Sequence, residues 1–216
     1  SLKDIENKRR QVFKPVLDNP YTQAPWPRVD PQQGHDIRDI LCTLLEPIGR
    51  HNAHLKTHPE LKPSAPLTFQ HATIGFNSTV KALELQAPVG KGRSKVVYPA
   101  LSVVFVCKPE ISPSLITQHF PVLSYVASSP ERKVKLIQLP RGSMEKLSEA
   151  TGQPHTGIVG ITKEMPGAST LLAIINENVE DVEVPWLENV DFFSKPVLKV
   201  LKTTAPIIKK TNVQKK

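Results

Sequence analysis

Residues suited to binding an anion lie together in the segment Thr73–Glu84. Gly75 permits a tight turn, or a close approach of the backbone, at the end of a strand. Asn77 can cap a helix, whose first N–H groups then point outward and attract negative charge. Lys81 stands one turn further along the same face, placed to meet a phosphate or a base edge. The spacing predicts an anion-binding helix start, although an ordinary capped helix with an exposed lysine explains the same residues.

Two further segments contain residue types that bind ligands. His51, His54 and His58 have a spacing that suits a metal on one helix face, but only Glu46 is near enough to complete a site, and a solvated face is the simpler interpretation. The segment 88–94 is glycine-rich and basic, but its glycines lack the spacing of a nucleotide-binding loop. A flexible loop touching phosphate and a plain solvated loop both fit it.

Catalytic motifs are missing from the sequence. It has no nucleophile elbow, no zinc-protease motif and no dinucleotide-binding glycine pattern. The two cysteines, Cys42 and Cys107, form no metal-binding pair, and Cys107 lies in an apolar run typical of a core. No signal region or membrane-length apolar run is found. We therefore expect a non-catalytic, intracellular protein with reduced thiols and with no metal, cofactor, small-molecule substrate or membrane.

Positive charge is concentrated at both ends of the chain. Of the net charge of +8, residues 195–216 contribute seven lysines and no acid, residues 1–14 contribute five cations and two acids, and the rest therefore carries −2. Cationic ends on a nearly neutral body favour a polyanion, because each neutralised phosphate releases condensed counterions. Solubility or nuclear import would also explain such ends. The candidate RNA contacts at the ends are Arg9, Arg10, Lys14, Lys199 and Lys202.

Alternating helices and strands predict an α/β domain between the ends. Helices are predicted over about 36–57, 77–85, 113–127, 143–150 and 166–176, the fourth capped by Ser143. Buried strands are predicted over 101–107, 134–139 and 157–162, with an edge strand at 182–184. The resulting organisation is an extended N-terminal arm over 1–34, an α/β sandwich domain over 35–190 and a basic tail over 191–216.

The pattern Gly-x-Asn-x-Thr-x-Lys-Ala-x-Glu over 75–84 resembles the RNA-contacting helix of the kink-turn-binding ribosomal-protein superfamily. The segment His119–Leu123 and the loop Gly152–Gly157 are also similar, and the likeness covers about residues 35–180. It implies a three-layer α-β-α sandwich with a small mixed β-sheet. It assigns RNA contacts to Gly75, Asn77, Ser78 and Lys81 in the helix, and to His155 and Thr156 in the loop.

Two positions depart from the superfamily pattern. Ser78 stands where a glutamate typically accepts from a guanine, and Leu85 stands where an arginine is common. His155, in a shorter second loop, can stack on a splayed base. The resemblance therefore implies that Asn77 and Lys81 touch the RNA backbone while recognition specific to a kink is weakened.

The flanks resemble a fungal family of subunits shared by ribonuclease P and ribonuclease MRP, named for the processing of precursors. The similar segments are Lys8–Pro20, Trp26–Val29, Pro185–Leu187 and Leu198–Ile207. The resemblance implies a nuclear and nucleolar subunit bound to both particles' RNAs and to their other proteins. One particle matures the 5′ ends of precursor tRNA and the other cleaves precursor rRNA. The RNA is the catalyst in both, so the family implies no catalytic residue here.

Three other functions are compatible with parts of the sequence. The chain could serve mainly as a protein-interaction scaffold, which the apolar residues within the arms favour in part. A general kink-turn-binding protein of ribosomal or small nucleolar type fits the domain but not the flanks. A hydrolase of unfamiliar type would cleave precursor tRNA without added RNA, which we do not expect.

Deletion of residues 195–216 tests the role of the basic tail. We expect the logarithm of the association constant for RNA to fall less steeply with the logarithm of the salt concentration, because fewer lysines then displace counterions from phosphate. Filter binding over a salt titration measures the slope. An unchanged slope would show that the tail has no part in RNA binding.

Overall fold

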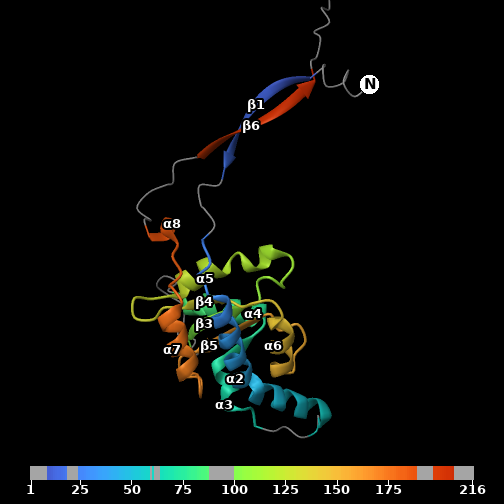
Figure 1. The fold of residues 1–216 in the computed structure, drawn as a ribbon, viewed down its shortest axis with the longest axis vertical. Helices are drawn as coiled ribbons and strands as arrows, with labels where there is room; N and C mark the ends of the chain where they lie inside the picture. Colours follow the sequence, from blue (N-terminus) through green and yellow to red (C-terminus); the bar gives the residue numbers. More distant parts are fainter. Residues whose placement is uncertain are drawn as a thin grey trace, which may run out of the picture. The chain divides into compact units, whose positions relative to one another are not determined.

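Four short strands form a mixed sheet in the larger of two compact units (Figure 1). Their order across the sheet is β2 (Ala72–Ile74), β5 (Ile158–Thr162), β3 (Leu101–Val106) and β4 (Lys135–Gln138). β3 and β4 run parallel, whereas β5 pairs antiparallel with both β2 and β3. The small mixed sheet predicted from the sequence is confirmed.

The computed structural model describes residues 9–18, 24–58, 60, 64–87, 100–188 and 197–206. We describe its two units separately. Gln23–Pro185 forms the unit called the body here, and the second unit takes in both flanks, Ser1–Thr22 and Trp186–Lys216. The glycine-rich segment 88–94 lies outside the described residues.

Helices cover both faces of the sheet, which confirms the three-layer sandwich. On one face, α2 (Pro31–Thr57), α6 (Ser143–Thr151) and α7 (Ser169–Asn178) share a core cluster with Val103 and Phe105 of β3. Because successive strand side chains point to opposite faces, the buried Val104 and Val106 lie on the other face. There, α4 (Phe76–Gln86) contacts three strands and α5 (Phe120–Ala127) contacts β4.

Three short helical segments complete the described part of the body and its border. These are α3 (Leu67–His71), the 3₁₀ turn η1 (Ser114–Thr117) and α8 (Pro185–Glu188). Among the described residues, no helix combines the length and the apolar content needed to cross a membrane.

The first long helix begins inside the segment predicted to be an extended arm. α2 starts at Pro31 rather than near residue 36. Asp30 accepts a hydrogen bond from the Gln32 N–H at 2.9 Å, and Pro31 suits a first helical position that needs no donor. Pro47 lies within α2 without ending it. The end of the predicted arm 1–34 is therefore helical.

Two predicted helices differ at proline and glycine positions. The helix predicted over 113–127 is divided into η1 and α5, since Pro121 has no N–H group and fits only the first turn of a helix. α7 begins at Ser169 rather than Pro166, after a turn in which Gly167 has φ +79°. The edge strand predicted at 182–184 is not found among the described residues, although Val182 and Val184 are buried.

The two basic flanks pair with each other. β1 (Arg9–Asp18) and β6 (Val197–Pro206) form a two-stranded antiparallel sheet, called the ribbon here, in an unbroken register from Arg9 opposite Pro206 to Asp18 opposite Val197. Figure 1 shows the two strands as neighbouring arrows. Residues 9–18 and 197–206 are extended, but their pairing with each other was not expected from the sequence.

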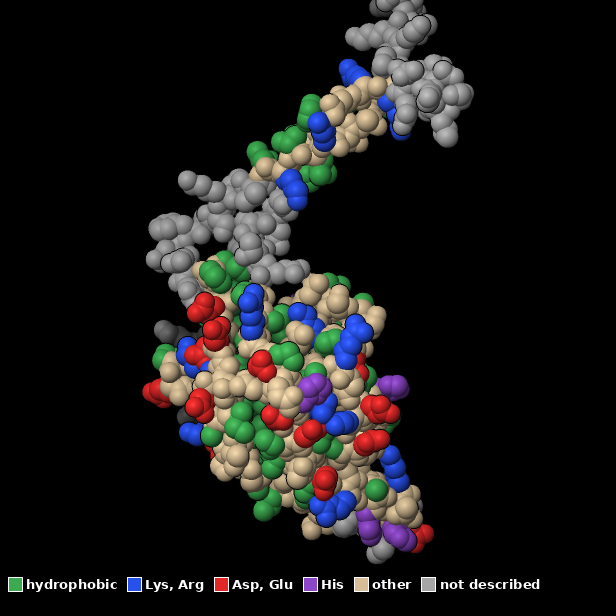
Figure 2. Space-filling model, viewed as in Figure 1, with side chains coloured by type: hydrophobic (Ala, Val, Ile, Leu, Met, Phe, Trp, Pro, Cys, Tyr) green, Lys and Arg blue, Asp and Glu red, His purple; other side chains and the backbone are tan. Residues whose placement is uncertain are grey.

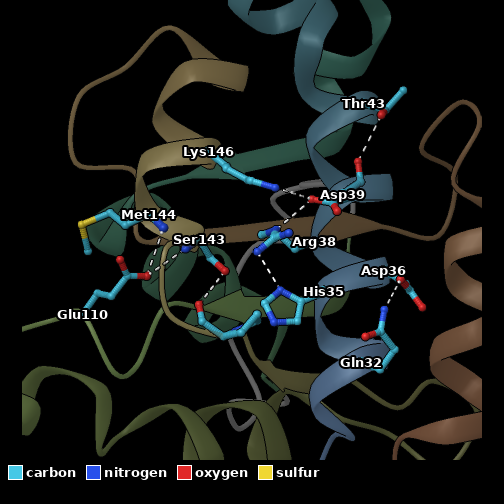
Figure 3. A network of polar contacts seen from close by, with 11 residues as sticks. Gln32, His35, Asp36, Arg38, Asp39, Thr43, Glu110, Ser143, Met144 and Lys146 are labelled. Atoms are coloured by element: carbon cyan, nitrogen blue, oxygen red, sulfur yellow. Dashed lines mark hydrogen bonds and ion pairs between the residues drawn. The ribbon is translucent and has the colours of Figure 1, made fainter.

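A polar network on the body joins α2 to α6 (Figure 3). The buried Arg38 guanidinium donates to Asp39 Oδ1 at 2.8 Å and to Nδ1 of His35 at 2.8 Å, and Lys146 of α6 reaches the same carboxylate at 3.1 Å. The hydrogen bond from Arg38, opposed by partial burial and supported by Lys146, lowers the pKa of Asp39 to about 2. Asp39 therefore stays ionised and compensates the buried charge of Arg38.

Asp39→Asn should lower the free energy of unfolding by about 1–3 kcal/mol at neutral pH, because Arg38 stays buried and loses its charged acceptor. Lys146→Gln is the matched control and should cost less than about 1 kcal/mol, since this lysine is half exposed.

The pH dependence of stability gives a second test. Because the pKa of Asp39 is lowered from 3.8, the Asp39 carboxylate stabilises the fold fully above pH 3.8, and this contribution is lost as the pH falls towards about 2. Urea unfolding across that range should show less acid sensitivity for D39N than for the unmutated protein. Equal sensitivity would contradict the assignment.

Candidate nucleic-acid interface

Gly75 fixes the start of α4. It has φ +88° and ψ 167°, a conformation open essentially to glycine, and its N–H donates to the Ile158 carbonyl of β5 at 2.8 Å. Gly75 is therefore the helix cap, and Asn77, predicted as the cap, is the second residue of the helix. No side chain caps the first turn, so this turn offers the positive end of the helix dipole to an anion.

The other predicted contact residues of α4 have exposed side chains. They are Asn77, Ser78 and Lys81. The Ser78 hydroxyl donates to the Ile74 carbonyl, so towards an outside group it can act only as an acceptor. No ion pair found in the described part of the chain involves Lys81. Asn77 and Lys81 are thus the donors that α4 presents one turn apart.

The loop Gly152–Gly157 is held by Thr156 together with Thr151 at the end of α6. Thr156 is buried, its N–H donates to the Ser148 hydroxyl at 3.0 Å, and its hydroxyl contacts the Thr151 hydroxyl and the Gln153 carbonyl, each at 3.0 Å. The side chain of Thr156, predicted to contact RNA, therefore points into the protein, where its hydroxyl is already hydrogen-bonded. Its role is to fix the loop.

α2 anchors the same loop from outside. Asn52 donates to the Thr151 carbonyl and Lys56 to the Gly152 carbonyl, both at 2.8 Å. These side chains satisfy carbonyl groups at the end of α6 that have no partner within the helix. The loop therefore has a fixed position relative to α2 and α6.

A hollow of about 320 Å³ lies between the start of α4 and this loop. Phe76 borders it on the helix side and the exposed His155, with φ +57°, on the loop side. The apolar side chains of Ile111, Ile116 and Met144 contribute to its lining. Its other lining residues are Gly75, Glu110, Ser112, Gly157 and Ile158. A mainly apolar hollow with a few polar groups at its edge suits a flat organic ring.

Glu110 organises one wall of the hollow. Its carboxylate accepts from the N–H groups of Ser143 and Met144, each at 3.1 Å, and so caps α6 (Figure 3). Ser143, predicted as the cap, is instead the first helical residue. Sequence reasoning missed Glu110 because it lies 33 residues before the helix it caps. The parallel pairing of β3 with β4, which brings the loops after both strands to the same edge of the sheet, is the signal that could reveal it.

The remaining candidate ligands show no assembled site. No group of three or more metal-ligating side chains is present among the described residues. The rings of His54 and His58 lie 5.1 Å apart, and His51 contacts the ring of Phe69. Burial raises the pKa of Cys107 to about 12, which keeps this thiol protonated and unreactive.

The five basic candidates from the chain ends all lie on the ribbon and have exposed side chains. They are Arg9, Arg10 and Lys14 on β1, and Lys199 and Lys202 on β6. The Lys202 ammonium lies 6.0 Å from the centre of the Phe13 ring in the facing strand. The candidates thus fall into two groups, one at the hollow of the body and one on the ribbon.

Residues 8–189 match the family described as RNase P subunit Pop3. The chain belongs to this family. It is 31% identical to the ribonucleases P/MRP protein subunit POP3 of Saccharomyces cerevisiae, over 97% of this chain and 96% of the yeast protein. The Pop3-family chain is also similar to the solved structure of the 15.5kD RNA binding protein of Giardia lamblia, with 13% identity and a TM-score of 0.37, over 65% of this chain and 88% of that protein.

Substitutions at two glycines test the backbone geometry at the start of α4. Gly75→Ala should lower the free energy of unfolding by about 1–3 kcal/mol, because its conformation excludes side chains even though nothing lies within 4 Å of the added carbon. Gly142 is the matched control, with φ +80°, ψ 5° and equally open surroundings. Asparagine tolerates that left-handed conformation, so Gly142→Asn should be milder than Gly75→Asn in urea unfolding. Equal costs at the two positions would contradict the geometry.

Proposed function

We propose that this chain is a non-catalytic, RNA-binding protein subunit of ribonuclease P and ribonuclease MRP that binds their RNA at the start of α4. The observation that carries the proposal is that the start of α4, which no side chain caps, and the fixed loop Gly152–Gly157 border one open hollow. Membership of the Pop3 family, and likeness to a yeast subunit named for both particles, support the biological setting. In that setting the chain supports 5′ maturation of precursor tRNA and processing of precursor rRNA, in the nucleus and nucleolus.

A phosphate placed before α4 would meet several favourable groups. The first-turn N–H groups supply the positive end of the helix dipole. Gly75 leaves open space where a side chain would stand, which allows a close approach of the RNA backbone. Asn77 adds an exposed amide and Lys81 a full charge one turn further along. These contacts fix the position of the RNA without reading its sequence.

The hollow suits a base turned out of an RNA strand. Ile111, Ile116 and Met144 offer apolar contact, and the His155 ring at the border can stack on the base. Ser78 and Leu85 replace groups that would read a guanine or hold a phosphate, so we propose that shape and stacking outweigh base-specific hydrogen bonds here. Recognition specific to a kink is correspondingly weaker.

The ribbon supplies a second, electrostatic contribution in this proposal. It carries the five cations Arg9, Arg10, Lys14, Lys199 and Lys202 against one acidic residue, Asp18. Cations on an extended element can neutralise successive phosphates and release their counterions. This part of the affinity should therefore fall steeply with salt.

A protein-interaction scaffold is the second candidate function. The observation that favours it is the exposure of large apolar side chains on the ribbon, including Phe13 and Leu17. If this function dominates, photocrosslinks from α4 in the assembled particle should reach only protein. RNA crosslinks from Asn77 would favour the RNA-binding function.

Lys81→Ala should weaken binding of transcribed ribonuclease P or MRP RNA about tenfold, which corresponds to roughly 1.4 kcal/mol for one lost charge-assisted contact. It should also reduce the magnitude of the salt slope by about 0.7–0.9. Lys163→Ala is the matched control: it removes the same charge from an exposed lysine just beyond the far end of β5 and should change Kd less than about twofold. Filter binding measures both. Equal losses for the two variants would reject a site at α4 in favour of diffuse attraction.

A further inference from the structure

The ribbon has apolar side chains that neither strand covers. Phe13 is 59% exposed, Leu17 71%, Leu198 66% and Val200 60%. Two-stranded sheets are marginally stable alone in water and need a packed face for lasting order. Exposed apolar side chains that gather on one element mark interaction sites more often than isolated ones do. The ribbon therefore needs a cover from outside its two strands.

The register places these four side chains on one face, whereas the less exposed Val16 and Leu201 lie on the reverse face. Directly opposed residues share a face of a sheet, and so do residues two apart along a strand. Leu17 lies opposite Leu198 and Pro15 opposite Val200, and Phe13 follows on the same face. These five residues form the surface that we call the apolar face. Figure 2 shows apolar side chains gathered along the ribbon beside lysine and arginine side chains.

Cations border the apolar face at one end. Lys202 lies opposite Phe13, with its ammonium over the ring, and Arg9 lies on the same face further along. Arg10, Lys14 and Lys199 fall on the reverse face by the same alternation. The apolar face thus offers an aliphatic centre with positive charge beyond Phe13.

The chemistry of this face favours a protein over RNA or a second ribbon. RNA binds through its phosphates and through bases that stack on flat side chains, and Leu17, Leu198 and Val200 offer neither charge nor ring. In a face-to-face pair of ribbons, Arg9 and Lys202 of each copy would lie against the same cations or against the aliphatic end of the other copy, and in neither case would they meet a carboxylate. Pairing with a third strand through β1 is disfavoured, because Pro15 removes an N–H group from that strand.

We propose that the apolar face of the ribbon docks on another protein of the particle, at an apolar surface bordered by carboxylates that meet Arg9 and Lys202. Aliphatic side chains of the partner cover Leu17, Leu198 and Val200, and its acidic rim matches the cations beyond Phe13. The reverse face stays open to RNA. This docking rests on membership of the family but does not depend on the RNA site at α4.

Photocrosslinking in the assembled particle tests the proposal. Benzoylphenylalanine replaces Phe13 or Leu198 in the full chain, and particles are assembled with the ribonuclease P RNA and the other protein subunits. The control position is Leu67 on α3, which is 68% exposed and belongs to the body. We expect both ribbon positions to give a product with the same protein subunit, resistant to ribonuclease and absent for Leu67. Three outcomes would overturn the proposal. They are crosslinks that ribonuclease removes, crosslinks within this chain or between its copies, and the lack of any crosslinked product.

Paired substitutions separate this docking from the RNA site. Leu17→Thr with Leu198→Thr introduces β-branched residues, which favour strands, and removes most of the aliphatic surface. With the subunit identified by crosslinking as the purified probe, this variant should bind it at least tenfold more weakly, while Leu67→Thr should bind it normally. Lys81→Ala should leave that binding intact and lose RNA affinity instead. Unchanged subunit binding by the double variant would overturn the docking, whatever Lys81→Ala does to RNA.

Discussion

The hydrogen bond from the Gly75 N–H to the Ile158 carbonyl is the constraint on which the candidate RNA site depends. It ties the start of α4 to the first residue of β5, and the loop Gly152–Gly157 leads directly into that strand. Helix terminus and loop therefore cannot move apart without breaking the edge of the sheet. A backbone with φ +88° and ψ 167° is required at this point, so glycine is the residue that allows the junction. The remaining parts of the site, the hollow and its border, follow from this junction.

Most of the body could be predicted because its signals are local. The apolar run Leu101–Val106 indicated a strand covered on both faces, and Gly75 with Lys81 indicated a helix start that presents donors. The expectations that differ from the structure depend on backbone geometry and on contacts that the residue pattern does not show. Asn77 and Ser143 were expected to cap helices, but Gly75 takes the first role and the Glu110 carboxylate, from another loop, takes the second. Thr156 was assigned an RNA contact by the resemblance to the kink-turn-binding superfamily, whereas its hydroxyl hydrogen-bonds within the loop and to the end of α6.

The body and the ribbon differ in how much apolar surface they bury. The body buries its apolar residues on both faces of a sheet, so the site at α4 rests on a rigid support. The ribbon buries little and carries much of the positive charge, and its ordering is best explained by partners. In the proposed function, the body holds RNA at a fixed point while the ribbon joins the subunit to other proteins of the particle.

The pairing of β1 with β6 also determines the order in which the parts of the chain can fold during synthesis. β1 precedes the first helix of the body and β6 follows its last, so the two strands are separated by the whole sandwich in the order of synthesis. In a nascent chain the sandwich domain can fold before β1 has its partner strand, because domains commonly fold as units during translation. The double strand can close only after the ribosome has released β6. Translation products that end before β6 would therefore contain a folded body but no ribbon. Partners that recognise the ribbon would then bind only chains in which β6 has been synthesised.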